Sequence, residues 1–149
     1  GREANVSVYT STAYMDALYI NGQLASGAEN VDLKGNYVES VPRLTSRNGV
    51  QANWRRFSAS LQYSFVDETY SDPYNTEQPN ANGTRGIVPA YALLDAHVGV
   101  TIMPNVRFRL SMNNLMDRSY FTKRPTIYPG PAVWPSDGRS VVGMVTVRL

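Results

Sequence analysis

The sequence contains no cysteine and a single histidine. Without cysteine the chain forms no disulfide and offers no thiolate to a metal ion, and one imidazole cannot supply a histidine metal triad. The absence of cysteine also suits a protein that crosses an oxidising compartment as an unfolded chain. These absences exclude disulfide-stapled scaffolds and the common thiolate and histidine metal centres.

Long apolar runs and blocks of like charge are also missing. No run approaches the ~20 apolar residues of a membrane helix, so any membrane role must come from strands. The 14 basic and 12 acidic residues are well mixed, with a net charge of +2, and form no polybasic tail of the kind that binds nucleic acid. The chain starts at Gly1 without an initiator Met or a signal peptide. We expect a mature product or, as the favoured alternative, a piece of a longer protein.

What the sequence does contain is strand periodicity. In Val106–Asn113, VRFRLSMN, even positions are apolar and odd positions are charged or polar. This alternation is typical of a strand with one polar and one apolar face. The same alternation occurs over 57–65, 92–102 and 141–149, more weakly over 44–54, and residues 6–20 have strand-like composition with ambiguous facing. No helical stripe competes, so the sequence predicts an all-β fold of six antiparallel strands.

The connections alternate between long and short. Loops of about twenty residues span 21–41, 67–89 and 117–138, whereas 55–56 and 103–105 are tight turns. Outer-membrane barrels have this asymmetry, with short periplasmic turns, long outer loops and strands of ~10 residues. The charges agree, because those in or beside the strands take the polar parity: Arg43, Arg47, Asp95, Arg107, Arg109 and Arg148. The alternation alone is equally compatible with a soluble β-sandwich.

Four stretches carry a resemblance to a known family. They are GNYVESVPRLTSRNGV, GIVPAYALLDAHVGV, RLSMNNLMDRSYFTKRP and YPGPAVWPSDGRSVVGMVTVRL. The second of them holds Pro89, Tyr91, Leu93 and Asp95, and the third holds Asn114, Leu115, Asp117 and Tyr120. Together they resemble consecutive blocks from the C-terminal end of a TonB-dependent outer-membrane receptor, closest to the ferric-citrate type. The resemblance covers almost the whole chain and is weakest over residues 1–36.

This resemblance implies an antiparallel, up-and-down transmembrane β-barrel segment. Family members have ~22 strands closed around a plug, so residues 1–149 are expected to be the C-terminal part of the barrel domain, without the plug or the TonB-box segment. It further implies a bacterial outer-membrane location, a ferric chelate as the transported ligand and no covalently bound cofactor. The implied partners are outer-membrane lipid and lipopolysaccharide, the remainder of the receptor, and the TonB complex through the N-terminal part.

The loop before the last strand is the candidate ligand site. Its prolines limit the entropy lost on binding, and its cations, which include Lys123, suit an anionic iron chelate because guanidinium pairs bidentately with carboxylates. The predicted ligand-site residues are Arg118, Tyr120, Arg124, Tyr128, Trp134 and Arg139. Alternatively, the rings belong to an interfacial aromatic belt, and the cations contact lipopolysaccharide phosphates or the Asp117 and Asp137 carboxylates.

The polar strand faces supply a second set of candidates, predicted to line the lumen: Asp95, His97, Arg107 and Arg109. Asp95 and His97 could orient a catalytic base, but no Ser or Cys motif accompanies them, so the sequence predicts no catalytic residue, no metal site and no enzyme activity. A rival hypothesis is a self-contained small β-protein that binds a ligand or adheres to a surface. It would be either a six-stranded assembly that oligomerises into a closed barrel or a soluble sandwich.

Overall fold

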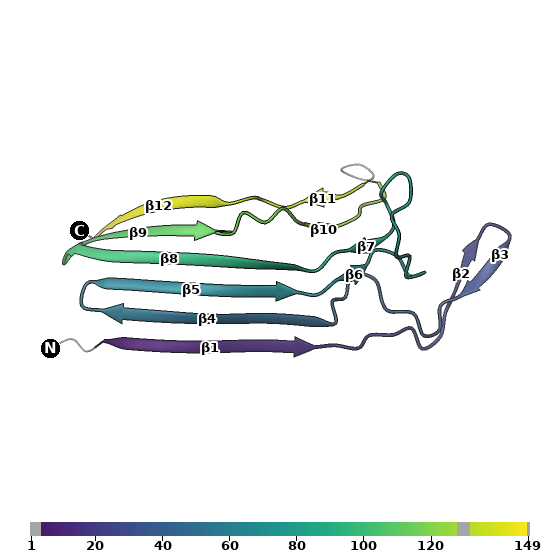
Figure 1. Ribbon diagram of the computed structural model, residues 1–149, viewed down its shortest axis with the longest axis horizontal. Helices are drawn as coiled ribbons and strands as arrows, with labels where there is room; N and C mark the ends of the chain where they lie inside the picture. The colour runs from purple at the N-terminus through teal and green to yellow at the C-terminus, as the bar shows by residue number, and fades with distance from the viewer. Residues whose placement is uncertain (1–3, 128–131, 149) are drawn as a thin grey trace.

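The structure is a computed structural model and describes residues 4–127 and 132–148. It consists mainly of one antiparallel sheet whose six long strands lie side by side in the order β1-β4-β5-β8-β9-β12 (Figure 1). Their bounds are Asn5–Tyr14 (β1), Leu44–Trp54 (β4), Phe57–Val66 (β5), Tyr91–Met103 (β8), Val106–Asn113 (β9) and Ser140–Val147 (β12). No helix in the described ranges is long and apolar enough to cross a membrane. The predicted meander of six antiparallel strands is confirmed.

The register gives the sheet two faces of different character. Because side chains alternate along each strand, residues paired across neighbouring strands share a face. One row across the sheet comprises Val8, Val50, Leu61, Ala96, Met112 and Val141. The next row, on the opposite face, comprises Ser7, Gln51, Ser60, His97, Ser111 and Val142. The first face is apolar and the second is polar, and the even positions of β1 belong to the apolar one.

The two ends of the sheet differ as the connections predict. The start of β1, the end of β12 and the tight turns lie at one end, which we call the turn end, and the long loops lie at the other, the loop end (Figure 1). The loops carry short antiparallel hairpins that the sequence did not predict: Gln23–Ser26 with Glu29–Asp32 (β2, β3), Thr69–Tyr70 with Ile87–Val88 (β6, β7), and Phe121–Lys123 with Trp134–Pro135 (β10, β11).

The predicted strand over residues 6–20 is wrong in its second half, because β1 ends at Tyr14. Its partner strand begins at Leu44, and the segment before it contains Pro42, which has no N–H to donate, and Ser40 with a φ of 61°. Residues 15–20 make only scattered backbone hydrogen bonds, such as those at the bridge between Leu18 and Tyr37. The strand-like composition therefore continues into residues 15–20, which have no continuous partner strand.

The sheet is a single layer with no core of its own. Among the described apolar residues only Leu33 and Val88 are buried, and neither belongs to a long strand. On the apolar face Val8 is 78% exposed and Val145 is 63% exposed. An apolar surface of this extent requires a cover of lipid or protein.

We therefore expect that the isolated chain does not remain a monomer in plain buffer. Strands β1 and β12 are open edges with unpaired backbone groups, and the apolar face is unprotected. Sedimentation and amide spectra in buffer with and without detergent test this. Aggregation or strand pairing between copies is the expected result, and a well-dispersed spectrum from a detergent-free monomer would overturn the lipid-facing assignment.

Candidate functional site

The base of the loop between β9 and β12, the 114–139 loop, is organised by one buried side chain. Asn114 is 4% exposed and adopts a φ of 49°, a conformation that asparagine tolerates better than most residues. Its side-chain Oδ1 accepts from the Arg118 backbone N–H at 2.9 Å, and its Nδ2 donates to the Arg118 carbonyl at 2.9 Å. Its backbone N–H donates to Asp95 Oδ1 at 2.8 Å. Asp95 thus anchors the loop to β8, a role that the sequence did not predict.

Arg118 and Tyr120 come together in one cavity at this base. The rings of Tyr120 and Tyr91 lie 4.6 Å apart between centroids, tilted by 31°, a favourable aromatic arrangement. The cavity is also lined by Tyr63, Phe65, Pro89, Ala90, Ala92, Ser119 and Phe121. Register places Tyr63, Phe65 and Ala92 on the apolar face, so this cavity lies at the loop-end rim of that face.

Arg124 reaches the neighbouring loop between β5 and β8, the 67–90 loop. Its Nη1 donates to the Gly83 carbonyl at 3.0 Å, and its Nε and Nη2 donate to the Ile87 carbonyl at 3.2 and 3.1 Å. The guanidinium also lies 4.9 Å from the Phe121 ring centroid, a cation–π contact. The half-buried Arg124 side chain therefore ties the two loops together.

Arg139 lies where the loop joins β12 and pairs with Asp117. Its Nη2 lies 3.5 Å from Asp117 Oδ2, and its backbone N–H donates to Asp117 Oδ1 at 3.0 Å. The two side chains are 51% and 56% exposed, so this is a surface ion pair. An exposed pair contributes under about 1 kcal/mol to stability, which leaves the cation accessible to a ligand.

The remaining predicted loop residues do not converge on this cavity. Trp134 lies in β11, where it pairs with Lys123 of β10 and is 50% exposed. Tyr128 lies outside the described residues. The structure thus brings Arg118 and Tyr120 together, pairs Arg139 with Asp117, and turns Arg124 towards the 67–90 loop.

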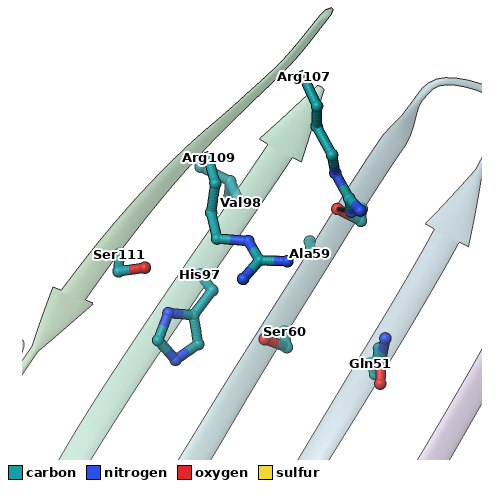
Figure 2. Close-up of a pocket in the computed structure, with 9 residues that line it drawn as sticks. Gln51, Ala59, Ser60, His97, Val98, Arg107, Arg109 and Ser111 are labelled. Atoms are coloured by element: carbon teal, nitrogen blue, oxygen red, sulfur yellow. Dashed lines mark hydrogen bonds between the residues drawn. The ribbon is translucent and has the colours of Figure 1, made fainter. Parts of the chain in front are cut away.

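All four side chains predicted to line a lumen lie on the polar face. Figure 2 shows Arg107 and Arg109 leaving β9 and extending across β8 towards β5, with Arg109 near His97. Arg107 Nη2 donates to Ser58 Oγ at 3.1 Å. The depression around them is also lined by Gln51, Ala59, Ser60, Val98 and Ser111. Within the described ranges, no three side chains of His, Cys, Asp or Glu gather closely enough to hold a metal ion.

Arg43, which was predicted to take the polar parity, contacts two tyrosines at the loop end of the sheet. It precedes β4, and its Nη2 donates to the hydroxyl of Tyr14, at the end of β1, at 2.9 Å. Its guanidinium lies 5.1 Å from the Tyr37 ring centroid and 5.8 Å from that of Tyr14. The hydrogen bond to Tyr14 is the main cause of a raised pKa for Arg43. Since register places Tyr14 with the apolar face, Arg43 holds a cation at the loop-end rim of that face.

A second polar contact near this rim joins Tyr19 to Glu39. The Tyr19 hydroxyl donates to Glu39 Oε2 at 2.7 Å, and this bond to the carboxylate raises the pKa of Tyr19. Both residues precede β4, so this bond helps to hold the segment that leads into that strand.

The comparisons identify the class of protein to which this sheet belongs. Residues 3–115 match the family model described as "TonB dependent receptor-like, beta-barrel". The match covers well over half of the chain, so the chain belongs to this family and forms an open part of such a barrel. Members are β-barrels of the outer membrane of Gram-negative bacteria, and the six long strands are outer-membrane strands.

Individual relatives agree with this assignment. The probable TonB-dependent siderophore receptor PiuA of Acinetobacter baumannii is 27% identical over 145 residues, which cover 91% of this chain and 17% of that protein. The unliganded ferric citrate transporter FecA superposes with a TM-score of 0.79 at 25% identity, over 95% of this chain and 20% of FecA. The PiuA crystal structure gives a TM-score of 0.76 at 24% identity, over 95% of this chain and 19% of PiuA. The chain therefore spans about a fifth of the length of its relatives.

Proposed function

We propose that residues 1–149 form the C-terminal part of the barrel domain of a receptor that imports an anionic ferric chelate, such as ferric citrate or another siderophore. The observation that carries this proposal is the similarity of nearly the whole chain to two proteins, one named a ferric citrate transporter and the other a siderophore receptor. The chelate is cargo rather than a cofactor, and the chain has no enzyme activity of its own.

The geometry supports a ligand site at the loop end. Arg118 and Tyr120 line a cavity at the loop-end rim of the sheet, and the exposed Arg139 directly precedes β12, at the base of the same loop. With Tyr128 and Trp134 they form the proposed ligand contacts, and Arg124 belongs to the site as the residue that positions the loop. Cations beside aromatic surfaces favour an anionic chelate with carboxylate groups.

The proposed partners follow from the location. The remainder of the receptor, with its plug and other strands, would cover the polar face and both edges, and the TonB complex would act through the N-terminal part. Outer-membrane lipid would cover the apolar face. At its rim, Arg43 is held against Tyr14 and Tyr37, which favours contact with lipopolysaccharide phosphates because arginine binds such groups well.

The test is equilibrium binding of a panel of ferric chelates to the folded complete receptor. We expect Arg139→Ala to weaken binding of an anionic chelate by roughly tenfold to a hundredfold, the effect of losing one charge-assisted hydrogen bond. Asp117→Asn is the matched control, because it breaks the same ion pair but keeps the cation and the Oδ1 acceptor. We expect this control to bind at least as tightly as the parent.

Heat-modifiable gel mobility verifies that each variant is folded. If both variants bind every chelate as the parent does, Arg139 acts only in the surface ion pair and has no ligand role. If the folded parent binds no ferric chelate at all, the proposed function itself is wrong.

A further inference from the structure

A polar patch interrupts the apolar face of the sheet between β1 and β4. Register places two neighbouring rows of hydrophilic side chains there, Thr10 beside Asn48 and Thr12 beside Ser46. We call these four residues the polar ladder. Apolar or aromatic side chains of the same face enclose the ladder on three sides: Val8 and Val50 towards the turn end, Tyr14 and Leu44 towards the loop end, and Tyr63 and Phe65 on β5.

Side-chain hydrogen bonds join the four residues of the polar ladder. Thr10 Oγ1 donates to Asn48 Oδ1 at 2.6 Å, and Asn48 Nδ2 donates to Ser46 Oγ at 2.9 Å. The hydroxyl oxygens of Thr12 and Ser46 lie 2.9 Å apart and form one further bond. The amide has two N–H groups and each hydroxyl has one O–H, so five donors make three bonds within the described part of the chain. Two donors, one of them an Asn48 N–H, are left over.

Lipid cannot use the donors that the polar ladder leaves over. Because apolar residues lie on both sides of it along the strands, the ladder falls within the apolar band that meets acyl chains under the proposed function. Acyl chains carry no hydrogen-bonding group, and the bilayer core holds no water to replace one. A polar group left unpaired in such surroundings is costly. The ladder therefore favours a cover of protein over a cover of lipid.

A shallow depression of the same face lies directly beside the polar ladder. Thr10 and Asn48 form part of its lining, together with Val8, Tyr9, Gly49, Val50, Leu61, Tyr63 and Leu94. Tyr63 is 42% exposed and follows Asn48 in the same row across the sheet. The amide of Asn48 thus lies in a hollow with an apolar rim, where side chains of a neighbouring protein have room to reach it.

The chemistry of the polar ladder indicates which protein surface fits it. The ladder is uncharged, so it offers no counter-ion to a charged partner. It holds spare donors next to oxygens with free lone pairs, so its complement is a surface with the same groups. Small and polar residues join membrane-spanning helices in this way, because short side chains allow close approach. A two-fold axis places identical patches against each other, so the ladder of a second copy is such a surface.

We propose that the polar ladder and the depression beside it form the surface through which two copies of the complete receptor associate side by side in the outer membrane. The proposal rests on the proposed function in one respect, that the chain belongs to a complete barrel whose apolar face meets lipid. It goes beyond that function by adding a homodimer. The spare N–H of Asn48 in each copy donates to an oxygen of the ladder in the other copy, out of reach of the lipid.

The experiment measures Förster transfer between complete receptors that carry a donor or an acceptor dye, reconstituted together in phospholipid vesicles at a series of protein-to-lipid ratios. We expect the parent to associate, and Asn48→Leu to raise the dissociation constant at least about tenfold. Leucine has nearly the size of asparagine but no hydrogen-bonding group, and a two-fold contact loses each bond twice. Thr10→Val removes one hydroxyl at nearly constant size, so it should weaken association in the same direction and by less.

Asn53→Leu is the matched control, because it makes the same change in the same strand on the polar face, where Asn53 pairs with Asn5 and Ser58. Its dissociation constant should equal that of the parent, and heat-modifiable gel mobility verifies that each variant is folded.

Two results would overturn the proposal: a parent that stays monomeric at every protein-to-lipid ratio, or folded Asn48→Leu and Thr10→Val variants that associate as the parent does. If the parent is monomeric and native mass spectrometry shows a bound phospholipid that Asn48→Leu loses, a lipid occupies the surface instead of a second copy. None of these measurements needs a ferric chelate, so a failure of the proposed function is seen separately, in the chelate-binding experiment.

Discussion

Replacing Leu110 with arginine should sharply reduce the amount of complete receptor that assembles in the outer membrane. Leu110 lies near the middle of β9 on the apolar face, in one row with Val98 and Gly143. Under the proposed function this face meets lipid in the assembled barrel, and a lipid-facing arginine at the bilayer midplane costs about 2–4 kcal/mol. Membrane fractionation and heat-modifiable mobility measure the assembled fraction.

The control is Ser111→Arg, one residue further along β9. Ser111 pairs with His97 and Val142 on the polar face. An arginine side chain at this position would lie beside other polar groups. Because a shift of one residue moves a side chain to the opposite face, this variant should assemble like the parent. Equal assembly of the two variants would show that the faces of β9 are assigned wrongly.

The long strands were predictable where alternation is strict, as in β9, because a period of two identifies both the strand and its faces. The end of β1 could not be predicted from the sequence, because the residues on both sides of Tyr14 have the same strand-like composition. What ends the pairing is the partner segment, where Ser40 has a positive φ and Pro42 lacks an N–H. An element boundary of this kind depends on residues far along the chain.

The candidate site was predictable to a similar extent. Parity alone placed Asp95, His97, Arg107 and Arg109 on one face, and the structure agrees. The bonds of these side chains depend on which strands are neighbours, so the contact between Asp95 and the Asn114 N–H was missed. The local bonds between Asn114 and Arg118 span four residues, and an Asn placed directly after a strand is a signal that could have indicated them.

Arg124 is the clearest case of a role hidden from sequence. Its chemistry suggested an anion ligand, but its carbonyl partners lie 37 and 41 residues away in the chain. Both partners belong to the 67–90 loop, whose fold depends on several tight contacts. One is at Gly86, where an added Cβ would come within 2.9 Å of the Pro79 Cα. No local pattern around Arg124 could predict that this loop presents two carbonyl groups to it.

We expect Arg124→Ala to separate the two loops and to weaken chelate binding indirectly. The change removes hydrogen bonds from a charged donor, each typically worth about 1.5–3 kcal/mol, and leaves the Gly83 and Ile87 carbonyls without this partner. Hydrogen exchange of the Ile87 amide, which donates to the Glu77 carbonyl at 3.1 Å, reports loosening of the 67–90 loop. Its exchange should be at least about tenfold faster in the variant.

Two further variants separate positioning from direct ligand contact. Lys123→Ala removes a neighbouring exposed cation and should leave the Ile87 amide protected. Arg124→Lys retains the charge but lacks the planar fork that serves both carbonyls at once, so a positioning role predicts that it exchanges and binds like the alanine variant. If lysine restores chelate affinity while the Ile87 amide still exchanges quickly, Arg124 acts on the chelate through its charge, and the link between the loops is not what binding requires.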